Sequence, residues 1–429
     1  MPSYQKELQI YSKSDVVVVG GGPAGIAAAV TAARLGKKVI LIEQTGSLGG
    51  ASVLAMVPEL MNFDDGKNFL STGIGKEIFD NLHYPHKYQR DWHNIRYEQL
   101  KRIYDAMVTK SGVEVLFYTH LTDVITEAGR VKYAVIATPN GMYVIKGSFF
   151  IDCTGNGSLS CFAGAQYEYG DEAGNTMSAT LCSLWGGVDF DKKPKDWLHY
   201  EEAYQDDIFS HYDTILPGIK ANYPEINVGG GNVGHCFQVD DRDVKSLTHA
   251  MFQGRKILEE YETYYQKYVE GCENATLIRS ADFIGIRESR RIRCVYTLTA
   301  DSFFAKESFD DEIGRYSYPI DIHPMTSDEA GMEGFNKSVA IRHEDGDSYS
   351  IPYRCLVPQH TTNVLVAGRC IGTDRSMQAS VRVIPCCYLT GQAAGAAASV
   401  CIDENANAID ANIKTLKTVL KNITETGIY

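Results

Sequence analysis

Two runs of apolar residues near the start of the chain have the pattern of strands that are buried on both faces of a parallel sheet. Residues 16–19 and 39–42 contain no polar side chain and are rich in β-branched residues. The stretch 26–38 between them is rich in alanine, which favours a helix. The pattern therefore predicts a strand, a helix and a second strand, the unit from which parallel sheets are built.

Glycines fill the connection between the first strand and this helix. Residues 20–25 read Gly-Gly-Gly-Pro-Ala-Gly, and Glu43 follows the second strand directly. In a G-x-G-x-x-G turn the glycines allow a tight turn, a close approach of the backbone to a pyrophosphate, and close contact between helix and strand. A helix amino terminus attracts phosphate, and an acidic residue at position 43 binds ribose hydroxyls. These features predict a dinucleotide site; the alternative is a glycine-rich turn without a ligand.

Further along the chain, three segments separated by turn residues predict a three-stranded antiparallel piece. The segments are 121–126, 131–138 and 142–146, with Ala-Gly-Arg and Asn-Gly between them. Asn-Gly favours a tight hairpin turn. The apolar stretch 148–153 then predicts a separate buried strand that ends on Thr154 and Gly155.

The last part of the chain predicts another buried strand and a helix of small residues. Residues 363–368 are mostly apolar, and Pro385 stands near the start of the charge-free stretch 383–402. Proline is favoured in the first turn of a helix because its missing N–H has no partner there. A Gly-x-x-x-Gly pattern and this length are also found in membrane helices. Because alanine and glycine replace the bulky side chains that face lipid, we expect the helix to pack against the first helix inside the protein.

Length and charge narrow the class of protein. The chain has 429 residues, which suggests two or three domains. Lys and Arg number 41 against 54 Asp and Glu, a net charge of −13, so we expect neither a nucleic acid nor a membrane surface as partner. The 11 cysteines form no C-x-x-C pair and no spacing typical of a metal site. They suit reduced thiols, and without an apolar leader at the start the expected location is the cytoplasm. No metal site is predicted.

Taken together, these stretches resemble the FAD-dependent oxidoreductase family of the glutathione-reductase-like flavoproteins, of the GR2 type. The sequences that carry the resemblance are DVVVVGGGPAGIAAA, LGGAS, FFIDCTGNGSLSCFAG, ADFIGIRESRRI, YPIDIHP, YSIPYRCLVP and NVLVAGRCIGTDRSMQASVRVIP. The resemblance implies an α/β fold, in which a glutathione-reductase-like Rossmann domain of parallel sheet plus β-meander binds FAD and an α+β substrate domain is inserted. The expected limits are 1–165 and 351–429 for the two parts of the FAD domain and 166–350 for the insertion.

The resemblance also implies one FAD, which we expect to be bound without a covalent link. The cofactor-binding residues carried over from the family are Gly20, Gly22, Pro23, Ala24, Gly25, Glu43, Gln44, Gly49, Gly50, Val124, Thr154, Gly155, Gly368, Arg369, Ser380 and Val383. Within this set, the glycines of 20–25 would hold the pyrophosphate and Glu43 the adenosine ribose. Gly49 and Gly50 would approach the phosphate and the flavin.

The remaining members of the set belong to the two ends of the cofactor. Val124, Thr154 and Gly155 would lie at the adenine end, and the residues between 368 and 383 would surround the ribityl chain and the isoalloxazine. For Val124, Thr154 and Ser380, ordinary packing between sheet and helix is an equal alternative.

Five arginines crowd the segment 279–293 and are the first candidates for binding an anion. A guanidinium binds a carboxylate through paired hydrogen bonds, and we place Arg287 and Arg290 nearest to the substrate. The alternative is ordinary ion pairing with Asp282 and Glu288, the acidic residues of the same segment.

His323 is the candidate general acid or base, because an imidazole can exchange a proton near neutral pH. The family resemblance of its surroundings supports this role, and a structural histidine is the alternative. His235, which follows a run of glycines at 229–231, is a further candidate.

The predicted function is hydride transfer between flavin N5 and a small polar organic substrate, which is anionic if the arginines bind it. Oxidation of the substrate is favoured over reduction. No cysteine precedes Cys153, which argues against a flavoprotein disulfide reductase. The glycine-rich run at 229–234 is interpreted as a connecting loop and not as a site for NAD(P)H. One alternative is a flavin-containing subunit that exchanges electrons with a redox partner protein, and another is a binding protein without redox activity. The sequence leaves the oligomeric state open.

Overall fold

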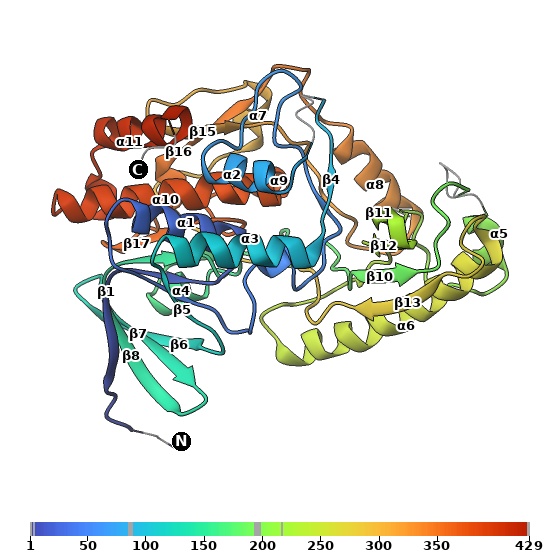
Figure 1. The fold of residues 1–429 in the computed structure, drawn as a ribbon, viewed down its shortest axis with the longest axis horizontal. Helices are drawn as coiled ribbons and strands as arrows, with labels where there is room; N and C mark the ends of the chain where they lie inside the picture. Colours follow the sequence, from blue (N-terminus) through green and yellow to red (C-terminus); the bar gives the residue numbers. More distant parts are fainter. Residues whose placement is uncertain (1, 3–4, 85–88, 193–198, 216–217, 427–429) are drawn as a thin grey trace.

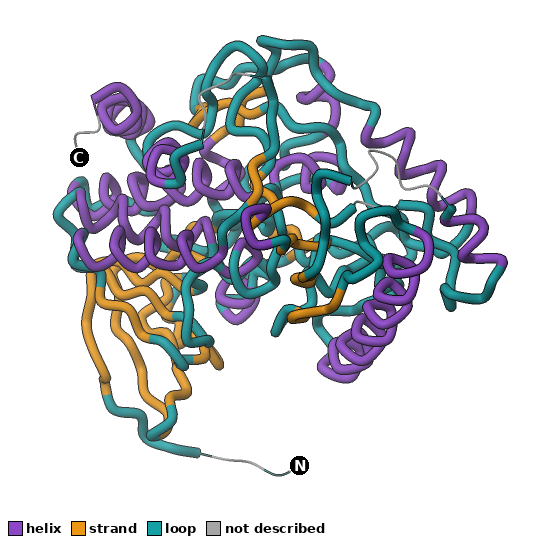
Figure 2. The backbone as a smooth tube through the Cα atoms, turned by 45° about the vertical axis from the view of Figure 1, so that its right-hand side comes forward, coloured by secondary structure: helices purple, strands orange, loops and turns teal. Residues whose placement is uncertain are grey.

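The computed structural model describes residues 2, 5–84, 89–192, 199–215 and 218–426. Figure 1 shows a large sheet with helices packed over it, and a smaller sheet beside a long helix on the other side of the molecule. Figure 2, a view turned by 45°, shows the strands of the large sheet gathered below the helices.

The large sheet has seven strands, and its core is parallel. The strands are β1 (Ile10–Val19), β2 (Val39–Ile42), β5 (Glu114–Leu116), β6 (His120–Glu127), β7 (Arg130–Thr138), β8 (Gly141–Asp152) and β17 (Val364–Val366). Their order is β5-β2-β1-β8-β7-β6, and β17 also pairs with β8. The pairs β2–β5, β1–β2, β1–β8 and β8–β17 are parallel, whereas β6–β7 and β7–β8 are antiparallel. The predicted α/β class with a Rossmann-like parallel core is confirmed.

One prediction about this sheet is wrong. The segments 142–146 and 148–153 were expected to be two strands, but the structure has the single strand β8. Its first half pairs with β7 and its residues 150–152 pair with β17 on the same edge. Gly147 allows this continuity, since a Cβ there would lie 2.8 Å from Val17 Cγ2 of the neighbouring strand. The antiparallel piece is therefore joined directly to the parallel core.

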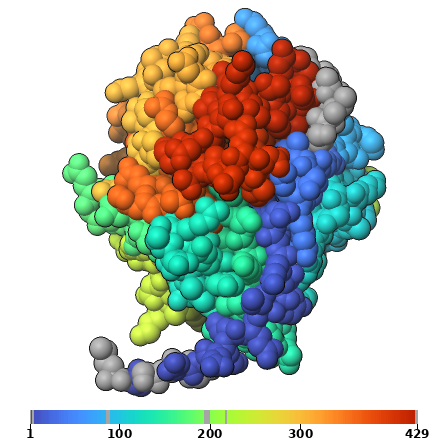
Figure 3. All heavy atoms as spheres, turned by 90° about the vertical axis from the view of Figure 1, so that its left-hand side faces the viewer, coloured from blue at the N-terminus to red at the C-terminus, as the bar shows by residue number. Residues whose placement is uncertain are grey.

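Helices cover the large sheet and bring the two ends of the chain together. They are α1 (Pro23–Arg34), α2 (Ile74–Asn81), α3 (Tyr97–Lys110), α4 (Ser158–Phe162), α9 (Arg375–Val381), α10 (Ile384–Asp403) and α11 (Ile413–Thr426). As expected, α10 packs closely on α1: a Cβ on Gly391 would lie 2.1 Å from the carbonyl oxygen of Ala24, and one on Gly395 2.3 Å from that of Ala28. Figure 3 shows the amino-terminal and carboxy-terminal segments adjoining on one face.

Length and apolar composition show whether a helix among the described residues could span a membrane. No single helix is long and apolar enough to span a bilayer, although α9 and α10 pass together as a pair bent by 95°. Residues 384–401 of α10 are all buried inside the protein. Packing against α1 therefore accounts for the apolar composition of this helix.

The segment between the two parts of the large sheet carries the other elements. A four-stranded antiparallel sheet in the order β11-β12-β10-β13 consists of β10 (Ser183–Gly186), β11 (Lys220–Tyr223), β12 (Val228–Gly231) and β13 (Thr276–Ser280). The helices of this segment are α5 (Tyr200–Gln205), α6 (Val244–Tyr268), α7 (Ala300–Phe304) and α8 (Glu329–Val339). Its two-stranded pairs are β9 (Tyr167–Glu168) with β14 (Arg291–Ile292) and β15 (Glu312–Tyr316) with β16 (Tyr349–Pro352).

Short elements complete the structure. β3 (Glu59–Leu60) pairs with β4 (His93–Asn94). The 3-10 helices are η1 (Gly50–Ser52), η2 (Pro224–Ile226), η3 (Tyr353–Leu356) and η4 (Ala408–Asp410). Asp243 caps the long helix α6 by accepting a hydrogen bond from the N–H of Lys245, as an amino-terminal aspartate commonly does.

The expected limits of the inserted domain, at residues 165 and 350, stay a prediction.

The contact between α1 and α10 predicts the effect of adding one methyl group. Gly391→Ala should lower the free energy of unfolding by about 1–3 kcal/mol, because the helices have to separate to accept it. The matched control is Gly334→Ala on α8, where a Cβ would meet nothing within 4 Å, and which should stabilise the protein by about 0.5–1 kcal/mol. Chemical denaturation measures both. Equal stability of the two variants would contradict close packing at Gly391.

Candidate functional site

The carboxyl ends of β1 and β8 meet the start of α1 at the predicted dinucleotide site. Gly20 has φ +99°, and a Cβ there would lie 2.4 Å from the carbonyl oxygen of Cys153. A Cβ on Gly25 would lie 1.8 Å from the carbonyl oxygen of Gly20. Only glycine fits at both positions, so the two glycines have the roles in turn and helix–strand contact that the motif predicts.

The start of α1 has room for an anion. Gly22 is the residue before the helix and Pro23 its first residue, so no side chain caps the first N–H groups. A Cβ on Gly22 would meet nothing within 4 Å, in contrast to Gly20 and Gly25. Free N–H groups and open space at a helix start are what a phosphate requires. The geometry around Gly22 and Ala24, at the start of the buried helix α1, therefore fits the pyrophosphate of a dinucleotide.

Glu43 lies beside this turn and is almost fully buried. Its carboxylate accepts hydrogen bonds from the N–H groups of Gly21 and Thr45, both at 2.8 Å. Its carbonyl oxygen accepts a hydrogen bond from the N–H of Thr119 at 3.1 Å. Gln44, by contrast, is exposed. Thr119 was missed by sequence reasoning because it precedes the antiparallel piece without any motif of its own.

The Gly49–Gly50 pair also reaches the turn. The N–H of Gly49 donates to the carbonyl oxygen of Gly21 at 2.8 Å. A Cβ on Gly50 would lie 3.1 Å from the Cα of Gly22. The structure therefore brings the second glycine pair against the first, as expected for two segments that share one ligand.

Residues from the end of β8 and β17 close the other side. Thr154 donates from its hydroxyl and its N–H to one carboxylate oxygen of Asp152, at 2.7 and 3.1 Å. The guanidinium carbon of Arg369 would lie 3.0 Å from a Cβ on Gly155, and Gly368 lies against Ala24. The Nε of Arg369 is buried without a hydrogen-bond partner among the described residues. A buried cationic donor without an acceptor fits a site that holds an anionic cofactor.

Three predicted cofactor residues have other surroundings. Val124 lies in the middle of β6, paired with Ala134, and its side chain belongs to a hydrophobic cluster beside the sheet. Ser380 is fully buried, where its hydroxyl bonds to the carbonyl oxygen of Tyr318 at 2.6 Å and to the hydroxyl of Tyr349 at 2.7 Å. Val383 is the residue before α10. The side chain of Ser380 thus has the packing role that was the alternative. The contact of Val124 with the adenine was expected through its backbone and stays a prediction.

A second polar cluster lies next to the start of α10 and contains His323. His323 Nδ1 is 2.9 Å from His235 Nε2, and His235 Nδ1 is 2.9 Å from Asp213 Oδ2. His323 Nε2 is 3.4 Å from Asp321 Oδ1. Arg382, directly before α10, donates to the other oxygen of Asp321 at 3.0 Å. His235 was a candidate from the sequence, but Asp213 was not, because nothing in its local sequence sets it apart.

The chain of partners fixes the proton positions on both imidazoles. A carboxylate can only accept, so His235 Nδ1 carries the proton that it donates to Asp213. His235 Nε2 is then an acceptor, and His323 Nδ1 must donate to it. The free lone pair of neutral His323 is therefore at Nε2, beside Asp321.

Burial and charge set the protonation of this cluster. Burial lowers the pKa of His323 to about 3, and the positive charge of Arg287 contributes in the same direction. Burial opposes ionisation of Asp321, but protonated His323 and the cations Arg382 and Arg287 favour it and hold the pKa of this carboxyl below its usual range. His323 is thus neutral at neutral pH and able to accept a proton, with an ionised carboxylate beside it.

Arg287 approaches this cluster and is buried, with 8% of its surface exposed. It donates to Ser178 O at 2.8 Å, to Thr180 Oγ1 at 2.9 Å and to Asn232 Oδ1 at 3.0 Å. These partners are all neutral. Burial lowers the pKa of Arg287 to about 10, and the charge of Arg382 adds to this effect. Arg287 is therefore a buried cation whose hydrogen-bond partners do not neutralise its charge.

The structure does not bring Arg290 to the same place. Its guanidinium donates to the carbonyl oxygen of Asn156 at 3.1 Å and lies over the ring of Tyr167. The segment around it is not a regular strand, because β14 comprises only Arg291–Ile292. Arg287 and Arg290 therefore contact different neighbours, and the placement of both nearest to the substrate stays a prediction.

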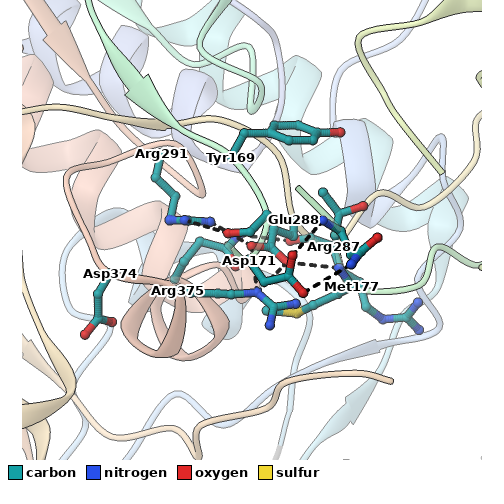
Figure 4. A network of polar contacts seen from close by, with 12 residues as sticks. Tyr169, Asp171, Met177, Arg287, Glu288, Arg291, Asp374 and Arg375 are labelled. Carbon is teal, nitrogen blue, oxygen red and sulfur yellow. Dashed lines mark hydrogen bonds and ion pairs between the residues drawn. The ribbon is translucent and has the colours of Figure 1, made fainter. Parts of the chain in front are cut away.

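The other arginines of the segment form ion pairs. Arg279 pairs with Asp282 at the surface. Figure 4 shows Arg291 and Arg375 converging on Glu288, whose side chain is fully buried. Arg291 donates to Glu288 at 2.7 Å and Arg375 at 3.0 Å. The pairing with Asp282 and Glu288 is thus correct for these residues but not for Arg287.

The fold and the first cluster define a dinucleotide-binding protein of the Rossmann-like class. A family model described as FAD dependent oxidoreductase matches residues 15–420. The chain belongs to this family. Membership confirms FAD as the predicted cofactor and the prediction of an enzyme.

Relatives with known names match over shorter stretches. A thiamine thiazole synthase of Aeropyrum pernix is 30% identical over 141 residues, which cover 32% of this chain and 48% of that protein. One of Pyrococcus horikoshii is 30% identical over 176 residues, which cover 36% of this chain and 63% of that protein. The chain thus spans about half to three-fifths of these relatives. A solved structure titled as a geranylgeranyl bacteriochlorophyll reductase-like protein of Thermoplasma acidophilum has a TM-score of 0.47 and 14% identity, covering 96% of this chain and 84% of that one.

The open space at Gly22 predicts a variant that folds but binds FAD poorly. Gly22 has ordinary φ of −75°, so Gly22→Ala should leave the free energy of unfolding of the FAD-free protein within about 0.5 kcal/mol. Its methyl group would occupy the space for phosphate, and we expect at least about tenfold weaker FAD binding, a loss of about 1.4 kcal/mol. Quenching of FAD fluorescence on titration measures the affinity. Wild-type affinity in this variant would contradict the assigned phosphate position.

Proposed function

We propose that the protein is an FAD-dependent oxidoreductase that oxidises a small anionic organic molecule at a C–H bond next to a hydroxyl or amine. The observation that carries this proposal is the buried guanidinium of Arg287, with only neutral hydrogen-bond partners, next to the neutral imidazole of His323. A cation that binds the anionic group and an acceptor for the proton are what such a substrate requires of the site. We also propose the glutathione-reductase-like type, which the antiparallel strands β6–β8 inserted into the parallel sheet support.

The residues around α1 would hold the cofactor. The N–H groups after Gly22 would bind the pyrophosphate, Glu43 the ribose, and Arg369 an anionic part of the cofactor. When bound, FAD supplies a two-electron acceptor. The α9–α10 corner joins this region to the second cluster, because Gln378 of α9 donates to the carbonyl oxygen of Arg287 at 2.9 Å.

Arg287 would bind a carboxylate of the substrate. A buried cation is costly, and an entering carboxylate would offset this cost through charge-assisted hydrogen bonds. Asn232 and Thr180 already orient the guanidinium, so little further ordering is needed. These contacts favour an anion over an uncharged analogue of the same shape.

His323 would accept a proton from the substrate at Nε2. Asp213 and His235 are positioning residues in this proposal, since they hold the proton of His323 on Nδ1. Asp321, 3.4 Å from Nε2, would stabilise the imidazolium that forms. The low pKa of His323 keeps the imidazole unprotonated under neutral and mildly acidic conditions.

We also propose that the protein is located in the cytoplasm.

Bleaching of the flavin absorbance tests the substrate class. A panel of small 2-hydroxy and 2-amino acids is compared with the corresponding amides, which have the same shape without the charge. We expect at least one acid to bleach the flavin anaerobically while its amide does not. Bleaching by amides at the same rate, or by no acid, would overturn the anionic substrate.

Removal of the Arg287 charge should change both KM and pH dependence. For a bleaching acid, Arg287→Gln should raise KM by about 10- to 100-fold, the effect of losing a charge-assisted contact. Because the Arg287 charge helps to lower the pKa of His323, its loss should move the acid limb of kcat/KM to higher pH. Arg293→Gln, at a half-exposed ion pair with Glu168, is the matched control. An acid limb that moves to lower pH, or does not move, would contradict the effect of the Arg287 charge on the pKa of His323.

Replacement of Asp213 tests the proton position on His323. Asp213 accepts from the backbone N–H and Nδ1 of His235 through one oxygen, and from the N–H of Ile215 through the other. In Asp213→Asn the amide NH2 must face one of these donors. If it turns to His235, both imidazoles change tautomer and His323 Nε2 becomes protonated. We expect kcat to fall about 10²- to 10⁴-fold with smaller effects on KM. A variant with wild-type kcat, while His323→Gln is inactive, would exclude this positioning role.

A further inference from the structure

A groove separate from the His323 cluster is lined by residues of α3 and of the four-stranded sheet. Its volume is about 380 Å³, within the range of small-molecule sites. One wall is the loop after Gly50, with Val53 and Met56. The opposite wall comes from the inserted sheet and the adjoining η2. Neither His323 nor Arg287 borders it.

The lining is mainly apolar and partly open to water. Leu184 of β10 and Val53 lie on opposite walls. At the rim, Ile226 is 64% exposed and Ile278 is 52% exposed. Large aliphatic side chains gain when a ligand removes them from water, by about 25 cal/mol per Å². The groove therefore favours a ligand with substantial apolar surface.

The charged residues at the groove are neutralised by partners. Lys101 pairs with Glu98 at 2.6 Å, and Arg279 pairs with Asp282 at 2.5 Å. Arg96, next to α3, pairs with Glu225 beside Ile226. An anion would have to compete with these carboxylates, and a cation with the paired lysine and arginines. This balance favours an uncharged ligand, in contrast to the surroundings of Arg287.

The groove shares two elements with the sites already described. Val53 lies against Gly49, since a Cβ there would be 2.4 Å from Val53 Cγ2. On the inserted sheet, Leu184 follows Cys182, whose sulfur lies 3.6 Å from Asn232 Oδ1, the acceptor of Arg287. The groove thus adjoins the Gly49–Gly50 loop assigned to FAD, and through β10 it lies near the residues that contact Arg287.

We propose that this groove is a second binding site, specific for an uncharged, largely apolar organic molecule about the size of a two-ring aromatic compound. This site goes beyond the proposed oxidation of an anion, because the groove favours an uncharged, apolar ligand over a charged one. A protein with both sites can hold a charged and an apolar molecule at the same time.

Two fluorescent probes with the same aromatic frame test this site in the FAD-loaded protein. N-phenyl-1-naphthylamine is uncharged, and 1-anilinonaphthalene-8-sulfonate carries a negative charge. We expect saturable binding of one uncharged probe per chain, at least tenfold tighter than the sulfonate. Arg287→Gln should leave this binding unchanged, which separates the groove from the proposed substrate pocket. Absence of saturable binding, or tighter binding of the sulfonate, would overturn the proposal.

Matched variants locate the probe. Ile226→Asp should weaken binding of the uncharged probe about tenfold or more, whereas Phe252→Asp, at an equally exposed position on α6 (64%), should not change it. Both residues are at the surface, so both variants should fold, and thermal unfolding checks this. Asp282→Asn removes the ion-pair partner of Arg279 and should reduce the difference in affinity between the uncharged probe and the sulfonate. Equal effects of Ile226→Asp and Phe252→Asp, or an unchanged difference in affinity in Asp282→Asn, would contradict the assignment.

Discussion

The contact between α1 and α10 holds the two ends of the chain together, and the candidate site depends on it. Gly391 and Gly395 let the helix backbones approach to a distance that any side chain would prevent. The same contact places Gly368 against Ala24, so that the end of β17 joins the glycine turn after β1. Helices usually pack 8–10 Å apart according to the side chains between them. The absence of those side chains at Gly391 and Gly395 allows the closer approach of α1 and α10.

Buried charge is the second constraint. Asp213, Asp321 and Glu288 are all buried, and each has a histidine or arginine partner at the distances given above. Arg287 differs, since its direct partners are neutral oxygens. A buried charge without an opposite charge in contact costs free energy, and a protein retains one where a ligand supplies the missing charge. The site therefore combines a compensated hydrogen-bond network with a buried guanidinium, that of Arg287, whose hydrogen-bond partners are neutral.

The strand β10 and its flanking residues connect two different environments. Thr180 accepts a hydrogen bond from the Arg287 guanidinium, and Cys182 contacts Asn232, which accepts another. Leu184 lines the apolar groove. The loop after Gly50 faces the groove with Val53 and the glycine turn with Gly49. Both surfaces thus adjoin the region assigned to the cofactor.

The sequence alone determined the features that depend on local conformation. The glycines at 20, 22 and 25, the acid at position 43 and the small-residue helix with Pro385 in its first turn act over a few residues, where spacing fixes geometry. Tertiary structure decided the rest. His323, His235 and Asp213 meet only because distant segments fold together. Arg287 and Arg290 have different neighbours because residues from distant segments, Ser178 and Asn232 for Arg287 and Asn156 for Arg290, accept their hydrogen bonds. Pairing across long stretches of chain depends on packing of the whole molecule, which no local pattern encodes.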